Sequence, residues 1–577
     1  MCRIHGQFNA DVSPAELRRV AATQRHGGPD GTGLAHGRRW ALGSNRLAVM
    51  DPAGGTQPYT LFGGVITVVF NGELYNHDEL RRDLTARGYT FTDRCDGSIL
   101  PALYHCYGDE FVERLDGMYA IAVLDRRTSP RLLLATDHIG MKPLYYSRRG
   151  NALYFASELP ALLAFDAVSA EPWLPGLDAY LATKTPFGER TMYEDVRVLP
   201  PASTAVCDRS GFRVTRRNTE STVDADVRET LRREVSRLLV ADVPVATITS
   251  GGLDSSLVTA LAAERGQVHT FNIAYRGTWP SDERHFARAV AEHTGAVYHQ
   301  VEIDPVQFPD LLADTVRHLG QPNADPITLS SYALFAAVRD AGFTVALTGD
   351  AADELFAGYG RMRNAVNGED WFDSYVDELG VLPTASRKAL YTKEYAAEIT
   401  EVPGLEQLRA GSGSTLRRIM AFEQAYRLPA YHLRRVDHLS MASSVEARLP
   451  FCQPSVIRAA AALPDESCID GTGVKRALYG AAQGLLPKQV LDRPKQPFTL
   501  PITAMLAPGW PLWDLANDLL TTPRLTAAGQ LEPTAVRALF ARQASRPDDT
   551  AALTIWALAV HELWREQAVE TVEAVAA

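Results

Sequence analysis

The sequence is poor in cysteine, and its few cysteines are not spaced as a metal site or a redox motif would need. Six occur among 577 residues, and no two of them form a Cys-x-x-Cys pair. Neither a disulfide framework nor a zinc site is indicated, and a reducing cytoplasm is the predicted location. The first residues, MCRIHGQFNADVSP, contain no apolar core of a secretion signal, which agrees with this prediction.

Long apolar runs and excess positive charge are missing too. No run approaches the roughly 18–20 residues that span a bilayer, so we expect no membrane partner. The net charge is -11, whereas a protein that binds the phosphate backbone needs a basic face, so we expect no nucleic-acid partner. The Walker A pattern Gly-x4-Gly-Lys-Ser/Thr is also absent.

The chain is long enough for more than one domain, and its pattern changes near residue 220. Before that point short strand-like runs dominate, which predicts stacked sheets with helices outside them, an α+β domain. The predicted strands are 65–70, 119–124, 131–135 and 153–156, with a helix near 79–87 and a turn at Asn71-Gly72. We take residues 1–210 as the first domain and 220–577 as the second, with the boundary inside 208–226.

In the second part strands alternate with helices, which predicts a parallel α/β sheet. The predicted strands are 244–249, 269–274 and 344–348, and the predicted helices are 255–265, 282–294 and 330–341. Beyond about residue 370 the pattern is mostly helical. Residues 550–565 are apolar nearly all round, which predicts a packed terminal helix.

A cysteine, Cys2, directly follows the first methionine. Removal of Met1 would leave the thiol and a free α-amine on one residue, and an amine with a reference pKa of roughly 7.7–8.0 can accept the thiol proton. Alone this observation is weak, because a cysteine at this position is more often a chance residue.

The surrounding motifs give Cys2 weight. They are RHGGPDGTG at 25–33, Arg46 in NRLAVMD, Gln57-Pro58, Asn71-Gly72-Glu73 in FNGELYN, Asp96 before Gly-Ser-Ile-Leu, and LDGMYAIAVLD at 115–125. In this order and spacing they resemble the class II glutamine amidotransferase domain of the asparagine synthetases, over residues 1–205. The resemblance implies an N-terminal-nucleophile (Ntn-hydrolase) αββα sandwich with glutamine as a substrate.

The resemblance also implies roles for the residues of these motifs. Cys2 would be the nucleophile, and the Asn71 side chain and Gly72 N–H would stabilise the oxyanion. Arg46 would bind the α-carboxylate of glutamine bidentately, and Glu73 and Asp96 its α-ammonium. Without the resemblance, Asn71-Gly72 is a plain hairpin turn and Arg46 a surface ion pair.

The family usually has Gly and Phe where Arg3 and His5 stand, and a second Arg where Gly27 stands. A cation beside the nucleophile would either lower the pKa of the thiol or crowd the glutamine site. We therefore predict a glutaminase that is slow, or tuned to another γ-acyl donor.

The segment SGGLDSS at 250–256 follows a predicted strand and opens a predicted helix, where backbone N–H groups bind anions. A Gly/Ser-rich turn that only caps the helix is the alternative. The segment resembles the PP-loop of ATP pyrophosphatases, which implies ATP as cofactor. On this resemblance the ATP-binding residues are Ser250, Gly251, Gly252, Asp254, Ser255 and Ser256, with Ile248 and Ile273 lining the adenine pocket or simply forming sheet core.

A second segment, TGDAADELFAGY at 348–359, ends another predicted strand. It resembles the SGEG(S/A)DE segment of asparagine synthetases. The resemblance adds Thr348 and Gly349 to the ATP site, assigns Mg²⁺ to Asp254 and Asp353, and makes Asp350 the acceptor of a proton from ammonia. Asp350 stands for a Glu and Ala351 for a Gly, which would reposition this base; solvated loop charge is the alternative.

Three further segments match the family. Arg493-Pro-Lys495-Gln496-Pro-Phe498 resembles RxKxxF, which implies that Lys495 neutralises phosphate charge as an acyl-adenylate forms. Residues 437–442 and 445–451 are expected to shape the synthetase site, although Glu446 and Arg448 are alternatively an internal ion pair.

These resemblances predict an asparagine synthetase-like, glutamine-dependent amidotransferase with a PP-loop synthetase domain. ATP would activate a carboxylate, and ammonia from glutamine, carried through a largely apolar internal tunnel, would displace AMP. Aspartate is the default acceptor, but a specialised-metabolite acid, or hydroxylamine as the nucleophile, fits the departures. An intramolecular cyclase of the β-lactam synthetase or lasso-peptide type with a vestigial N-terminal domain, and a non-catalytic glutamine or nucleotide sensor, are the alternatives. A homodimer is carried as an expectation.

Overall fold

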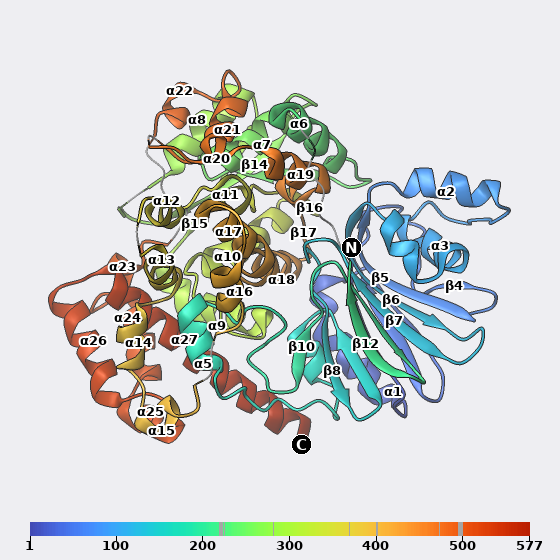
Figure 1. The fold of residues 1–577 in the computed structure, drawn as a ribbon, viewed down its shortest axis with the longest axis horizontal. Helices are drawn as coiled ribbons and strands as arrows, with labels where there is room; N and C mark the ends of the chain where they lie inside the picture. Colours follow the sequence, from blue (N-terminus) through green and yellow to red (C-terminus); the bar gives the residue numbers. More distant parts are fainter. Residues whose placement is uncertain are drawn as a thin grey trace.

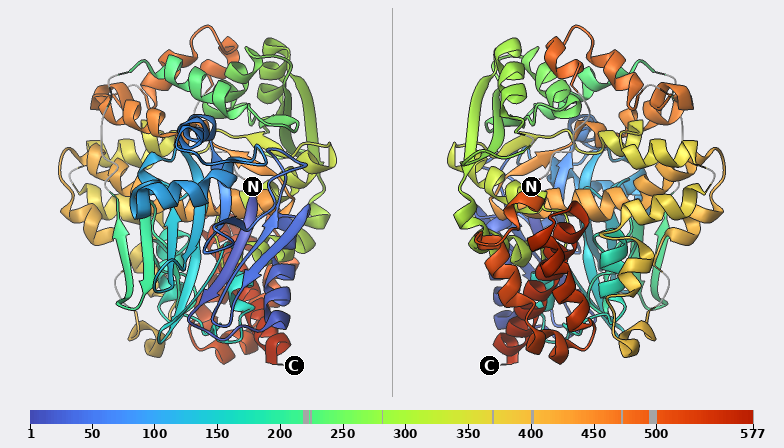
Figure 2. Two further views of the ribbon diagram at one scale, coloured as in Figure 1. Left: turned by 90° about the vertical axis from the view of Figure 1, so that its right-hand side faces the viewer. Right: turned by 90° about the vertical axis from the view of Figure 1, so that its left-hand side faces the viewer.

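The computed structural model describes residues 1–217, 223, 225–280, 282–368, 370–399, 402–471, 473–493 and 500–576, with side chains up to residue 568. Figure 1 shows the antiparallel sheets of the N-terminal part at the right and the parallel sheet with its helices at the left. Figure 2 shows the blue-to-cyan sheets facing the viewer from one side and the red C-terminal helices from the other. Within the described ranges, no helix combines the length and apolar character that a bilayer crossing would require.

Two antiparallel six-stranded sheets stack in the N-terminal part. The first consists of β10 (Val196–Val198), β8 (Tyr145–Arg149), β9 (Ala152–Ala156), β1 (Cys2–Phe8), β3 (Trp40–Arg46) and β2 (Gly31–His36), in that order. The second consists of β12 (Gly211–Arg216), β11 (Ser203–Asp208), β7 (Arg131–Thr136), β6 (Gly117–Asp125), β5 (Ile66–Leu74) and β4 (Tyr59–Leu61). All four strands predicted in this part are present.

Each sheet buries one face against the other and one against helices. Apolar side chains such as Ile4, Leu42, Val69 and Leu134 fill the space between the sheets. Helices α2 (His77–Ala86) and α3 (Leu100–Tyr107) cover the second sheet, while α1 (Pro14–Thr23) and α4 (Leu159–Leu163) lie against the first. Successive side chains of a strand point to opposite faces of its sheet. Where both faces carry apolar side chains, one must pack against the other sheet and one against helices. The predicted αββα order is confirmed.

The turn predicted at Asn71-Gly72 is wrong. Both residues continue strand β5, where Asn71 is paired with Ala120 and Gly72 with Tyr119 of β6. The ladder continues because β5 pairs with β6 along its full length, from Ile66 to Leu74, and this tertiary pairing outweighs the turn preference of the dipeptide. The oxyanion candidates therefore stand on a rigid strand.

The C-terminal part contains five parallel strands in the order β15-β14-β13-β16-β17. They are β15 (Val297–Ile303), β14 (His269–Tyr275), β13 (Val245–Ile248), β16 (Val345–Leu347) and β17 (Glu446–Arg448). Helices α7 (Leu253–Ala263), α8 (Arg284–Thr294), α9 (Phe308–Leu319) and α10 (Ile327–Asp340) form the crossovers. The predicted parallel sheet is confirmed, and the two edge strands, β15 and the short β17, are additions.

Helices build the remainder of the C-terminal part. They include α11 (Ala352–Phe356), α12 (Gly360–Asn367), the π-helix η5 (Glu423–Leu433), α18 (Arg434–Ala442), α21 (Arg476–Ala482) and the terminal α27 (Asp549–Ala576). The predicted packed terminal helix is confirmed, since Trp556 and Trp564 are buried. Trp564 Nε1 donates to Tyr193 Oη at 3.0 Å, so α27 packs against the N-terminal part.

Candidate functional site

The first candidate centre forms around Cys2, the first residue of β1. Gln57 Nε2 donates to Cys2 Sγ at 3.0 Å, and Cys2 N donates to Asn71 Oδ1 at 3.3 Å. Burial raises the pKa of the Cys2 thiol, while the amine of Met1 and the guanidinium of Arg46 oppose that rise. The thiol is therefore protonated when Met1 is in place, and it needs a base before it can attack a carbonyl.

Asn71 and Gly72 present what an oxyanion hole requires. Asn71 Nδ2 is buried and has no hydrogen-bond partner among the described residues. A Cβ at position 72 would lie 2.1 Å from Met118 O on the paired strand, so only glycine fits there. Because an unused buried donor is costly, the free amide of Asn71 indicates a group kept for a bound oxygen.

Three charged side chains lie around the thiol as the charges of an amino acid would need. Arg46 is paired with Cys2 across β1 and β3, and its Nη2 donates to Asp51 O at 2.8 Å. Burial, and then Asp96, raise the pKa of Glu73 well above its usual value. One guanidinium and two carboxyl groups are the set that the α-carboxylate and α-ammonium of glutamine would need, as the resemblance predicts.

Arg3 does not crowd this centre, contrary to one of the two expectations for it. Its side chain is fully buried, with Nη1 2.5 Å from Asp437 Oδ2 and Nε 2.6 Å from Glu158 Oε1. Lys142 Nζ lies 2.8 Å from the other oxygen of Asp437. A Cβ on Gly27 would lie 2.7 Å from Arg3 Cγ, so the two departures at positions 3 and 27 fit each other.

These residues also bear on the predicted tunnel. Asp437 belongs to α18 of the C-terminal part, so the interface beside the nucleophile strand is a buried ion-pair cluster rather than an apolar surface. His5, the remaining departure, packs beside Gly43 and Gln24, and burial lowers the pKa of His5 to about 4. A neutral imidazole in that position belongs to the core.

The edge strand β17 contacts the centre around Cys2 directly. Arg448 Nε lies 2.5 Å from Glu446 Oε1, which confirms the internal ion pair given as an alternative. Arg448 Nη2 also lies 3.7 Å from Glu73 Oε2, and Glu446 Oε2 lies 3.7 Å from the amine of Met1. A strand of the parallel sheet therefore contributes charges to the centre of the other part.

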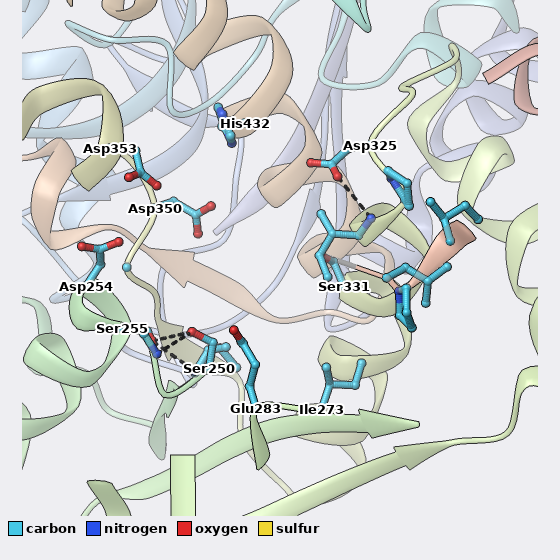
Figure 3. A pocket seen from close by; sticks show the side chains of 18 of the residues that line it. Ser250, Asp254, Ser255, Ile273, Glu283, Asp325, Ser331, Asp350, Asp353 and His432 are labelled. Carbon is cyan, nitrogen blue, oxygen red and sulfur yellow. Dashed lines mark hydrogen bonds between the residues drawn. The ribbon is translucent and has the colours of Figure 1, made fainter. Parts of the chain in front are cut away.

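The second candidate centre begins with the loop between β13 and α7. Gly251 has a φ of 79°, and a Cβ there would lie 2.6 Å from Ala287 N. Ser250 N donates to Ser255 Oγ at 3.0 Å, which closes the loop at the start of α7. Figure 3 shows Ser250 and Ser255 bonded side by side at the cavity wall. The loop thus places a helix N-terminus at the cavity, as an anion site needs.

A second loop, after β16, meets the first. A Cβ on Gly349 would lie 2.7 Å from Ser255 N, so glycine lets the two loops touch. Thr348 Oγ1 donates to Asp350 Oδ2 at 2.7 Å, and Arg435 Nη2 lies 3.4 Å from Asp350 Oδ1. These contacts fix the carboxylate of Asp350 at the cavity.

Most of the predicted ATP and metal residues line one cavity of about 1090 Å³. They are Ile248, Ser250, Gly252, Asp254, Ser255, Ile273, Thr348, Gly349 and Asp353, and the predicted base Asp350 lines the same cavity. Gly251 and Ser256 do not line it; the first shapes the loop and the second is buried behind it. Lys495 lies outside the described residues.

Sequence reasoning missed Lys475, which precedes α21. Its Nζ lies 2.6 Å from Asp254 Oδ2 and 2.6 Å from Asp353 Oδ1. The signal was the run Gly-Thr-Gly-Val-Lys ahead of a helical pattern, which carries no weight without the partners. Carboxylate oxygens are donors that Mg²⁺ takes, and in this structure the Lys475 ammonium lies between the two carboxylates. Because no described cluster holds three or more metal-ligating side chains, the ion would need phosphate oxygens as well.

Comparisons with known proteins agree with this geometry. The family model "Asparagine synthase" matches residues 226–566, and "Glutamine amidotransferase domain" matches residues 1–218. The chain belongs to the asparagine synthase family. It is accordingly a glutamine-dependent amidotransferase and an ATP-dependent carbon–nitrogen ligase.

Curated relatives extend over most of the chain. An asparagine synthetase [glutamine-hydrolyzing] 3 of Bacillus subtilis is 30% identical, over 84% of this chain and 83% of that protein. Asparagine synthetase [glutamine-hydrolyzing] 1 of the same organism is 28% identical, over 87% of each chain. Asparagine synthetase B of Escherichia coli is 27% identical, over 86% of this chain and 82% of that protein.

Proposed function

We propose that this family member frees ammonia from glutamine at Cys2 and attaches it to a carboxylate that has been activated as an acyl-adenylate. The observation that carries the proposal is the Nδ2 group of Asn71, which has no hydrogen-bond partner among the described residues and lies next to the strand that holds Cys2, in one chain with the PP-loop cavity. Aspartate is the reference acceptor, and a specialised-metabolite acid is the second candidate.

At the glutaminase centre the chain's own groups account for each proton. Once Met1 is removed, the α-amine of Cys2 takes the thiol proton. The thiolate attacks the side-chain amide, and Asn71 Nδ2 with the Gly72 N–H hold the oxyanion. The amine returns the proton to the departing ammonia, and water then releases glutamate from the thioester. Arg46, Glu73 and Asp96 hold the ends of the amino acid.

At the synthetase centre the two loops hold the nucleotide. The backbone of 250–255 would bind the pyrophosphate, and Ile248 and Ile273 would face the adenine. Asp254 and Asp353 would hold Mg²⁺, which neutralises phosphate charge as pyrophosphate departs. Asp350, held by Thr348 and Arg435, would take the proton that ammonia loses when it attacks the acyl carbon.

The test separates the two centres. A Cys2→Ala variant should lose glutamine-dependent turnover and keep ammonia-dependent turnover, with AMP and pyrophosphate formed in the latter. Persisting glutamine use by this variant would remove Cys2 from the mechanism. Absence of pyrophosphate release with any acid would favour the sensor instead. Cytoplasmic location and a homodimer stay predictions, to be checked by cell fractionation and by light scattering.

A further inference from the structure

The guanidinium of Arg46, the predicted holder of the glutamine α-carboxylate, is occupied by backbone oxygens of the chain itself. Its Nη1 donates to Pro52 O at 3.2 Å, and its Nη2 donates to Met50 O at 3.2 Å and to Asp51 O at 2.8 Å. These carbonyls belong to one stretch, residues 49–52, which we call the covering segment. Three oxygens of the covering segment thus lie on the two terminal nitrogens that an acidic ligand would use.

The occupied nitrogens matter because of the way in which a guanidinium binds a carboxylate. Its N–H donors form a planar fork, and both two-point modes, end-on and side-on, use Nη2. In Arg46 this nitrogen already serves two carbonyl oxygens. A two-point contact with the α-carboxylate of glutamine therefore has to displace the covering segment, so the segment and glutamine compete for Arg46.

The covering segment is held in a backbone conformation that its own residues do not favour. Asp51 has a φ of 45°, in the left-handed region that residues other than glycine rarely adopt. Its N donates to Asp242 Oδ2 at 2.8 Å, and its Oδ2 accepts from Arg94 N at 2.8 Å. Asp242 N also donates to Val49 O at 3.2 Å. Contacts with neighbouring segments therefore keep the covering segment on Arg46.

Asp242 belongs to the C-terminal part of the chain. It stands three residues before β13, the strand that leads into the PP-loop, but it does not line the synthetase cavity. The side chain of Asp242 is exposed to solvent. Water competes for an exposed oxygen, so the hydrogen bond from Asp51 contributes only modestly and can open. Asp242 thus acts as a weak latch, which glutamine can open at a cost in affinity.

We propose that Asp242 restrains glutamine binding, because it holds the covering segment on Arg46 and glutamine binds only where that segment has lifted. The inference rests on the proposed function, since it concerns the glutamine of that reaction. The apparent affinity for glutamine is then lower than the intrinsic affinity by the fraction of molecules in which Arg46 is free. At low glutamine this restraint slows the glutaminase, an effect that the sequence had led us to expect from Arg3.

The first test measures glutamate release by the purified full chain as a function of glutamine concentration. Asp242→Ala removes the acceptor for Asp51 N, so KM for glutamine should fall about threefold to tenfold while kcat stays the same. Asp242→Asn keeps an acceptor oxygen and should retain a KM close to that of the parent chain. Asp78→Ala is the matched control, since the side chain of Asp78 is 86% exposed, and it should leave KM unchanged. Ammonia-dependent turnover should be the same in every variant.

A second test asks whether the effect acts through the α-carboxylate. The chloroketone analogue of glutamine carries this carboxylate and iodoacetamide lacks it, while both reagents alkylate a cysteine thiol. Asp242→Ala should raise the second-order rate constant for alkylation of Cys2 by the analogue about threefold to tenfold. The rate with iodoacetamide should stay unchanged, because this reagent does not need Arg46. Mass spectrometry of the N-terminal peptide identifies the modified residue.

Two kinds of result would overturn the inference. One is a KM for glutamine that rises or stays constant in Asp242→Ala. The other is an equal acceleration of alkylation by both reagents, which would show a general loosening around Cys2. Absence of glutamine hydrolysis in the parent chain would instead count against the proposed function, and the two alkylation rates would still decide whether Asp242 restrains Arg46.

Discussion

The amide of Asn71 is committed on one side and free on the other. Its Oδ1 accepts from Cys2 N, whereas Nδ2 has no partner in the described part of the chain. Replacing Asn71 by Ala should therefore lower kcat for glutamine hydrolysis by about 10²–10³, the usual loss when one oxyanion donor is removed. Stopped assays of glutamate release measure the effect, and ammonia-dependent turnover serves as the control. A loss of both activities would point to damage of the fold instead.

Lys475 offers a second prediction at the scale of single residues. Its ammonium holds Asp254 and Asp353 together, so Lys475→Met leaves two adjacent carboxylates without that cation. ATP–pyrophosphate exchange should fall by at least about a hundredfold, while glutamine hydrolysis persists.

Lys488, whose side chain is 90% exposed, provides the matched control. Lys488→Met should leave both activities unchanged. If Lys475→Met retained full exchange, the contact between Lys475 and the two carboxylates would have no part in nucleotide use.

Much of the site could be predicted because its motifs are local. The PP-loop and the segment after β16 are continuous stretches, and the chain places both at strand ends of one sheet. Lys475 could not be found in this way, because its partners Asp254 and Asp353 lie far away in the sequence. Arg3 was within reach: it follows Cys2 in a strand, and adjacent residues of a strand point to opposite faces. The crowding hypothesis ignored that alternation.

At the scale of elements, β1 and α18 are joined by buried charges. Burial alone would raise the pKa of the Glu158 carboxyl, but the neighbouring His26 and Arg3 lower this pKa to about 2. Arg3 and Lys142 likewise hold the pKa of Asp437 below its usual value. Arg3→Met removes a shared partner of two buried carboxylates and should cost about 3–5 kcal/mol of stability near neutral pH.

The sign of the pH dependence follows from those lowered pKa values. The ion pairs stabilise the fold fully above the unfolded carboxyl pKa of roughly 4 and lose that contribution as pH falls towards about 2. The parent chain should therefore unfold at a higher urea midpoint than Arg3→Met. This difference in midpoint should be largest at pH 7 and should shrink below pH ~4. Arg524→Met, which breaks a surface pair with Glu566, should change stability by less than about 1 kcal/mol at either pH. A gap that widens in acid would contradict the assignment.

At the scale of the whole molecule, β17 links the two centres. The Arg448 side chain lies near Glu73, and its backbone carbonyl accepts from Thr348 N at 3.1 Å, at the start of the Asp350 loop. Arg448→Lys keeps the charge but loses the planar fork. We expect a several-fold higher KM for glutamine and more glutamate released per amide formed, measured by paired product assays. An unchanged ratio of products would show that β17 does not couple the centres.

The whole fold was easier to predict than its interface. The pattern of apolar residues along the strands predicted both the antiparallel sheets and the parallel sheet, because this pattern depends on which faces of a strand are buried. The three-residue strand β17 carries too short a pattern to be detected, and its place depends on pairing with β16. Whether such a short segment forms a strand depends on its contacts with segments that are distant in the sequence.

The burial of Met1 bears on whether this residue can be removed before or after the chain folds. Its amine donates to Leu47 O at 3.1 Å, and the residue is 6% exposed. An aminopeptidase needs a free, extended end, so the removal of Met1 that the proposed mechanism requires would take place on the nascent chain, before β1 enters its sheet. Molecules that fold first would stay permanently inactive towards glutamine, and folded protein that retains Met1 should resist methionine aminopeptidase until it is unfolded.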